Sequence, residues 1–148
     1  MRHMTWIGAL AAVALMASGC AQMGMGSTVP LKAELTGASE VPPVPTPARG
    51  MANMTYDPGS KQLKWKVDYS GLSADGTAAH FHGPAAPGAN AGVVVPIAMG
   101  AAMKSPLEGA ATLTDAQAAD LLAGRWYVNV HSRNHAGGEI RGQAMRAQ

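Results

Sequence analysis

Hydrophobic and polar residues alternate with a period of two along much of the chain. The pattern is clearest over residues 61–70, where Leu63, Trp65, Val67 and Tyr69 alternate with mostly charged side chains. Successive side chains of a strand point to opposite faces, so this period predicts a strand with one buried and one solvated face.

A second alternating segment, residues 50–56, precedes the first across the sequence Asp57-Pro58-Gly59-Ser60. Residues of these types are typical of a tight turn, and the two segments are therefore predicted to form an antiparallel hairpin. Further strands are predicted at residues 31–37, 77–82, 93–98, 109–113, 125–131 and 139–145.

One helix is predicted among the strands. Thr114 and Gln117 have the spacing of a capping box, Leu121 and Leu122 supply an apolar face, and Gly124 marks the end. We expect a crossover helix that covers an edge of the sheet. Together with 18 Gly and 10 Pro, about eight short strands predict an all-β fold, a sandwich or Greek-key barrel.

The first twenty residues are typical of an export signal. Arg2 and His3 precede an apolar run over residues 4–16, which is shorter than a membrane-spanning helix requires. The run ends in Ala17-Ser18-Gly19-Cys20, which resembles the lipobox of bacterial lipoproteins. A lipobox usually has Leu, Val or Ile at the position of Ala17, so an ordinary secretory signal with an incidental cysteine is the alternative.

These features divide the chain into a lipoprotein signal peptide (1–19), a flexible tether (20–30) that begins at lipidated Cys20, and a folded domain (31–148). Ala21 follows the cysteine where inner-membrane lipoproteins carry Asp. By resemblance, we expect a lipid anchor in the outer membrane of the cell envelope, with the membrane as a partner through the lipid. A domain on the periplasmic side and one on the surface side both fit this pattern.

The composition of the chain argues against several classes of partner and enzyme. The charged fraction is 14%, the formal net charge is +2, and no basic stripe with interleaved aromatic residues is present, which argues against nucleic acid as a partner. Cys20 is the only cysteine, so the chain forms no internal disulfide. The chain has no nucleophile elbow, no phosphate-binding loop and no cysteine after Cys20 that could act as a nucleophile. The sequence therefore does not indicate a hydrolase.

The four histidines after the leader fall into two clusters, His80 with His82 and His131 with His135. Alternation places the rings of His80 and His82 on one strand face, about 6.5–7 Å apart, and turns Phe81 into the core. In the later strand, Trp126, Val128 and Val130 take the core face, and Tyr127, Asn129 and His131 face outward.

Imidazoles from two strands suit a Zn²⁺ or Cu²⁺ ion, so a copper or zinc site at His80, His82, His131 and His135 is one interpretation. The other is a set of polar histidines that cap loops. Glu139 and Arg141 share a face of the last strand and are candidates for contacts behind the metal ligands, or for a surface salt bridge of little energetic consequence. The loop at 83–92 either walls a cleft beside the histidines or is a plain surface loop.

Several segments together resemble the CHRD (chordin) domain family. They are residues 35–43, the His-x-His-Gly-Pro element at 79–85, residues 113–124, Tyr127-Val128-Asn129-Val130-His131 and residues 137–142. The resemblance implies an immunoglobulin-like β-barrel. In animal chordin this domain accompanies extracellular antagonism of growth factors, whereas microbial members are secreted or anchored proteins.

Two functions are compatible with these patterns. The first is a non-enzymatic binding or structural module of the envelope, which binds an envelope protein, a glycan or a metal ion at its histidine end. The alternative is a copper/zinc enzyme of superoxide-dismutase type, whose strand-borne His-x-His the chain resembles. The chain lacks the disulfide and the loop patterns of that enzyme.

Overall fold

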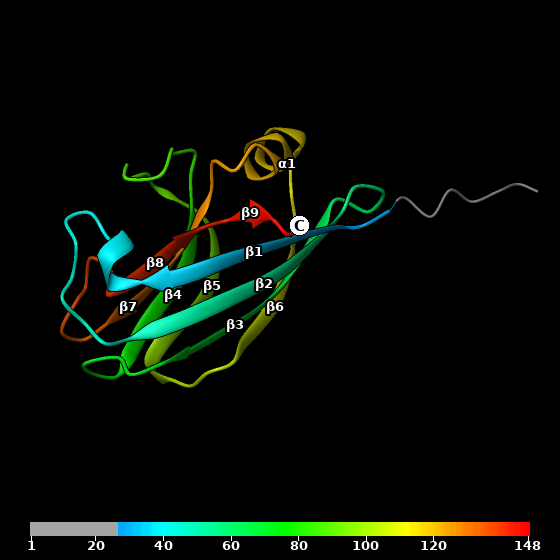
Figure 1. The fold of residues 1–148 in the computed structure, drawn as a ribbon. Coiled ribbons are helices and arrows are strands. Elements are labelled where there is room, and N and C mark those ends of the chain that lie inside the picture. Colours follow the sequence, from blue (N-terminus) through cyan, green and yellow to red (C-terminus); the bar gives the residue numbers. More distant parts are fainter. Residues whose placement is uncertain (1–26) are drawn as a thin grey trace, which may run out of the picture.

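A computed structural model describes residues 27–148 (Figure 1). The predicted signal peptide, Cys20 and most of the predicted tether lie outside these residues. The first strand, β1 (Val29–Thr36), begins two residues before the predicted start of the domain, because Val29 and Pro30 already pair with β2. Val29 also packs against the core.

The predicted hairpin is β2 (Arg49–Asp57) and β3 (Gln62–Ser70). Its turn is held by the carboxylate of Asp57, which accepts a hydrogen bond of 2.8 Å from the backbone N–H of Gly59. The remaining strands are β4 (Gly76–His82), β5 (Val93–Met103), β6 (Leu107–Thr112), β7 (Tyr127–Ser132), β8 (Ile140–Gln143) and β9 (Met145–Arg146). The last predicted strand is thus divided into β8 and β9.

All strand pairs are antiparallel, and the strand order is β5-β4-β7-β8-β1-β2-β3-β6, with β9 beside β1. The pairing of β3 with β6 and of β4 with β7 makes Greek-key crossovers. The two terminal strands of this order, β5 and β6, follow each other in the chain and contact each other, so the sheet is a nearly closed barrel. The predicted all-β fold is confirmed.

The predicted helix is α1 (Asp115–Leu122), preceded by Thr114 as its N-cap. The Thr114 hydroxyl accepts from the Gln117 backbone N–H at 3.2 Å, and the Gln117 side chain accepts from the Thr114 backbone N–H at 2.9 Å. Ala118 and Leu121 pack into the core, and the helix lies at one end of the barrel beside β9 (Figure 1). A short 3-10 helix, η1 (Gly37–Ser39), follows β1.

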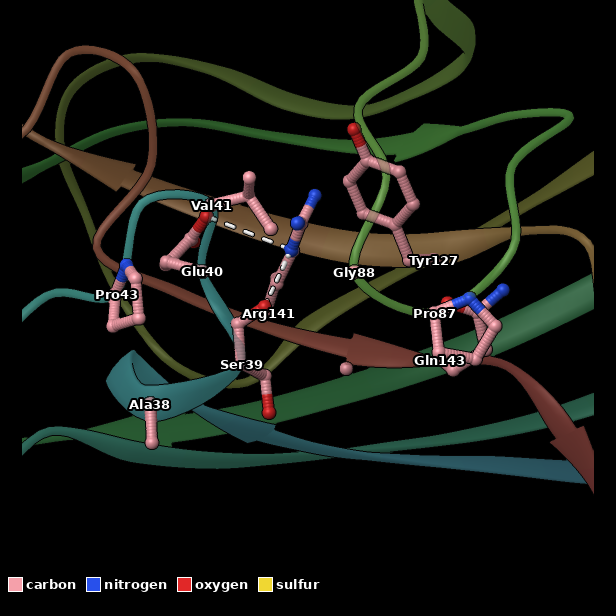
Figure 2. Close-up of a pocket in the computed structure, with 11 residues that line it drawn as sticks. Ala38, Ser39, Glu40, Val41, Pro43, Pro87, Gly88, Tyr127, Arg141 and Gln143 are labelled. Atoms are coloured by element: carbon pink, nitrogen blue, oxygen red, sulfur yellow. Dashed lines mark hydrogen bonds and ion pairs between the residues drawn. The ribbon is translucent and has the colours of Figure 1, made fainter.

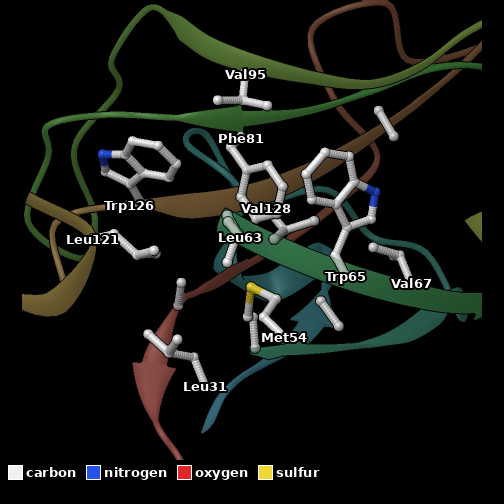
Figure 3. Packing of buried hydrophobic residues seen from close by; sticks show 14 of the residues in the cluster. Leu31, Met54, Leu63, Trp65, Val67, Phe81, Val95, Leu121, Trp126 and Val128 are labelled. Carbon is white, nitrogen blue, oxygen red and sulfur yellow. The ribbon is translucent and has the colours of Figure 1, made fainter. Parts of the chain in front are cut away.

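The barrel interior contains the packed rings of Trp65, Phe81 and Trp126 (Figure 3). The Phe81 ring lies 5.2 Å from that of Trp65 in an edge-on arrangement and 5.8 Å from that of Trp126. Phe81 and Trp126 are fully buried. Pairs of this geometry stabilise a core beyond the area they bury. Strand alternation therefore placed the inward side chains of β4 and β7 correctly.

Over residues 27–148, no helix is long and apolar enough to cross a membrane.

Candidate metal centre

Three histidines converge on the outer face of the paired strands β4 and β7. In this pair Ala78 lies opposite His131, His80 opposite Asn129 and His82 opposite Tyr127. Because alternate residues share a face, His80 and His82 stand side by side next to His131. One ring nitrogen from each of the three lies within 4.8 Å of the other two.

His135 does not join these three residues. It is half-buried in the turn after β7, and its backbone exchanges hydrogen bonds with Ser132. The same turn contributes a different group to the centre, since the carbonyl oxygen of Ala136 accepts a 2.9 Å hydrogen bond from Nδ1 of His131. Proximity in sequence to His131 was therefore a poor guide to a fourth ligand.

Backbone carbonyls set the tautomers of two of the rings. His131 donates through Nδ1 to Ala136, and His82 donates through Nδ1 to the carbonyl oxygen of Ala91 at 3.0 Å. Each ring thus carries its lone pair on Nε2. The Nε2 of His82 is buried and has no hydrogen-bond partner within residues 27–148. The Nε2 of His131 lies 3.1 Å from Nδ1 of His80.

The side chains of Tyr127, Asn129 and His131 lie on the outer face of β7 as predicted, but this face is covered by other parts of the chain rather than solvated. Tyr127, Asn129 and His131 are only 4%, 2% and 8% exposed. Burial lowers the pKa of His80, His82 and His131 below the ordinary value, and charge on a neighbouring histidine lowers that of His80 and His131 further. The rings are accordingly neutral at neutral pH, as metal ligands must be.

The loop at 83–92 forms part of this cover. The Ala91 carbonyl accepts from His82, and the Ala91 backbone N–H lies 3.2 Å from the Tyr127 hydroxyl. Asn90 donates to the Val41 carbonyl at 3.2 Å and accepts from Arg141 at 3.0 Å. The loop therefore packs over the histidine face, and its residues Pro87 and Gly88 line a cavity on the far side of Tyr127 that contains no histidine.

Glu139 and Arg141 are both buried, and neither bonds to a histidine or to the other within the described part of the chain. Glu139 instead accepts hydrogen bonds from Thr46, Ser73 and Ser132. These bonds lower its pKa even though burial alone would raise it. The predicted surface salt bridge between Glu139 and Arg141 is therefore wrong.

Arg141 pairs with Glu40, a residue that the sequence offered no reason to select. The Arg141 Nε lies 3.8 Å from a Glu40 carboxylate oxygen, and the other oxygen accepts a 2.7 Å hydrogen bond from Asn129. Burial raises the pKa of Glu40 to about 7, although Arg141 and Asn129 act in the opposite direction. The ring of Tyr127 connects the two clusters, since His82 stacks on it and the guanidinium carbon of Arg141 lies 4.5 Å from its centroid.

The fold and these clusters define a Greek-key β-barrel with a covered cluster of neutral imidazoles on one outer face. The family model of the CHRD domain matches residues 31–144, and the chain belongs to this family. Searches of the curated proteins and of the solved structures returned no match. Membership of the family supports a non-enzymatic binding module, and neither the match nor the structure favours the superoxide-dismutase alternative.

Proposed function

We propose that this protein is an envelope-anchored binding module that holds one copper or zinc ion through His80, His82 and His131. The observation that carries the proposal is the buried Nε2 of His82, which has no partner among residues 27–148 and belongs to a ring that clusters with those of His80 and His131. Burying such a polar atom without a partner costs free energy that a bound ion would offset.

The chemistry of the donors favours particular ions. The cluster contains three imidazole nitrogens and no carboxylate, and nitrogen donors of this kind suit Zn²⁺ and Cu²⁺ rather than Mg²⁺ or Ca²⁺. Three protein ligands leave one position for water or for a group on a partner. Bonds from Nδ1 of His82 and His131 to backbone carbonyls hold the rings in place, as is usual behind metal-bound histidines.

The test is elemental analysis of the full chain, prepared without an affinity tag and equilibrated with copper or zinc. We expect one bound ion per chain, lost in the His80→Ala/His82→Ala variant. His135→Ala is the matched control, because it removes an imidazole outside the cluster and should bind metal normally. Wild-type protein that stays metal-free, or a double variant that keeps its metal, would contradict the site. Thermal unfolding of each variant shows whether the fold survives.

The anchor is a separate part of the proposal, and it is supported by the lipobox-like sequence that ends at Cys20. Lipidation would hold the domain at the outer membrane, where an envelope protein or glycan is the expected partner. Labelling of cells with radioactive palmitate should mark the wild-type chain but not Cys20→Ser. A wild-type chain that is exported without label would indicate an ordinary secretory signal instead.

A further inference from the structure

The guanidinium group of Arg141 has hydrogen-bonding capacity that the described part of the chain does not use. Its Nε donates to the carbonyl oxygen of Ser39 at 2.7 Å, and its Nη1 donates to the side-chain oxygen of Asn90 at 3.0 Å. Its Nη2 is buried and has no partner among residues 27–148. A charged donor left unpaired is costly, so a group that accepts from Nη2 would be bound favourably.

The same guanidinium belongs to the wall of a cavity. A cavity of about 420 Å³ lies between the turn that carries Glu40 and the loop at 83–92. Val41, Pro43 and Pro87 make much of its wall apolar, and Tyr127 completes the side nearest the histidines. Figure 2 shows the end of the Arg141 side chain between Val41 and Tyr127. Arg141 is 3% exposed, whereas Val41 in the same wall is 37% exposed.

Arg141 is also held in one orientation before any ligand arrives. Contacts with Ser39, Asn90 and the face of Tyr127 fix the plane of its guanidinium. A donor that is already ordered loses little side-chain entropy on binding. Glu40 only partly offsets its charge, because burial raises the pKa of that carboxyl to about 7. The cavity thus presents an oriented cation beside apolar walls.

We propose that this cavity binds a small organic carboxylate, which accepts hydrogen bonds from Nη2 of Arg141 and lays its apolar part against Val41, Pro43 and Pro87. Guanidinium and carboxylate groups form strong charge-assisted hydrogen bonds. The apolar walls favour an organic acid over an inorganic anion, which would leave them in contact with a strongly hydrated ion. This site is additional to the metal centre and does not depend on it.

The probe is isobutyrate, with isobutyramide as a neutral compound of the same shape. Isobutyrate added to the ¹⁵N-labelled full chain at millimolar concentrations should shift the Nε–Hε signal of Arg141 and the amide signals of Gly88 and Gly142 in a saturable manner. Isobutyramide should not do so. Equal shifts with both compounds would show that the cavity does not select a carboxylate, and no saturable shift with isobutyrate would show that it binds none; either result would overturn the proposal.

Two variants, each with a matched control, localise the effect. Arg141→Lys should abolish the saturable shifts, while Arg133→Lys, which changes an exposed arginine, should leave them intact. Glu40→Gln should tighten isobutyrate binding at pH 8 about tenfold, equivalent to about 1.4 kcal/mol, because it removes a negative charge beside Arg141. Glu108→Gln makes the same change in net charge at an exposed site. If Arg141→Lys fails to fold, equal affinities of the two glutamine variants would overturn the proposal.

Discussion

The Nδ1 atom of His80 lies 3.1 Å from the Nε2 atom of His131. Two nitrogens that each lie about 2.05 Å from one metal ion are about 2.9 Å apart at a right angle and about 3.3 Å apart at a tetrahedral angle. The observed separation falls within this interval, and it also suits a hydrogen bond. In the hydrogen-bonded state His80 must be the donor, because the proton of His131 is on Nδ1 and is bonded to Ala136.

This relationship predicts a change of tautomer at His80 on metal binding. Without metal, His80 should carry its proton on Nδ1, and with Zn²⁺ bound at Nδ1 the proton should be on Nε2. His82 and His131 should keep theirs on Nδ1, because both donate to backbone carbonyls. Long-range ¹H–¹⁵N spectra of the histidine rings distinguish the two tautomers. A His80 ring that keeps its Nδ1 proton in excess zinc would contradict this ligand set.

Metal binding should also stabilise the folded domain. A ligand that binds only the folded state adds about 2.7 kcal/mol to the free energy of unfolding at one hundred times its dissociation constant. We expect a rise of several degrees in the melting temperature of the wild type with zinc, and none for His131→Asn. His135→Asn should respond as the wild type does. Calorimetric melts of the three chains with zinc and with a chelator make the comparison.

Alternation along β4 and β7 was enough to predict which side chains enter the core, because a period of two fixes the face of every residue in a strand. Phe81, Trp126 and Val128 are buried as expected. The capping box of α1 was equally readable, since its contacts span only three residues. The strand pattern left a sandwich and a Greek-key barrel open, and the family resemblance favoured the barrel.

Contacts between distant segments could not be read from local patterns. Glu40 follows η1 in a proline-rich turn, and it meets Arg141 only because β1 lies beside β8. The carbonyl groups of Ala91 and Ala136, which orient two histidines, belong to loops whose paths depend on the pairing of β4 with β7. Every residue type has a backbone carbonyl, so the sequence could not predict which carbonyl groups accept hydrogen bonds from His82 and His131.

Glu40 should make the domain less stable at higher pH. Its pKa rises from 4.5 to about 7 on folding, chiefly through burial. The folded state therefore favours the protonated form, and the stability this contributes is complete below pH 4.5 and is lost as the pH rises through 7. The full shift corresponds to about 3 kcal/mol, and screening by solvent in the adjoining cavity reduces the expected effect to about 1–2 kcal/mol.

Glu40→Gln tests this sign. The free energy of unfolding of the variant relative to wild type should increase from pH 5 to pH 8. The three clustered histidines act in the opposite direction: burial lowers their pKa, so their contribution is lost as the pH falls below 6.5. These histidines are present in both the wild type and Glu40→Gln, so their contribution cancels in the difference between the two free energies of unfolding. Urea denaturation at each pH supplies the values, and a difference that is constant with pH would show that Glu40 is not shifted.

Glu139 should be a major source of stability. Its carboxylate accepts from the hydroxyl groups of Thr46, Ser73 and Ser132 and from the Ser73 backbone N–H, and its side chain is fully buried. Glu139→Gln replaces one carboxylate oxygen, which accepts hydrogen bonds, with an amide NH₂ group. This group can only donate, and it would face the hydroxyl and N–H groups that now donate to Glu139. We expect a loss of about 2–4 kcal/mol in the free energy of unfolding.

The control for Glu139 is Glu34→Gln at an exposed position of β1, which should be nearly neutral. The pKa of Glu139 is lowered in the folded state, so its contribution should be present above pH 4.5 and decline as the pH falls through the folded pKa. Chemical denaturation of both variants at neutral pH provides the comparison. Equal stability of the two would refute the role given to the buried carboxylate.

Gly142 should not tolerate a side chain, although it lies in a regular strand. A Cβ atom at this position would overlap the carbonyl oxygen and carbon of Glu34 in β1, and these are backbone atoms that cannot rotate away. Gly142→Ala must therefore separate β8 from β1, at an expected cost of about 2–4 kcal/mol.

Gly92→Ala is the matched change in open space, where a Cβ meets nothing within 4 Å and the backbone is not in the left-handed region. There the loss of freedom in the unfolded chain should raise stability by about 0.4–1 kcal/mol. The two alanine variants should thus shift the urea midpoint in opposite directions. Because Arg141 precedes Gly142 in β8, the displacement caused by Gly142→Ala should also weaken isobutyrate binding, whereas zinc binding by β4 and β7 should survive. A Gly142→Ala variant that lost zinc binding and kept isobutyrate binding would contradict this placement of the two sites.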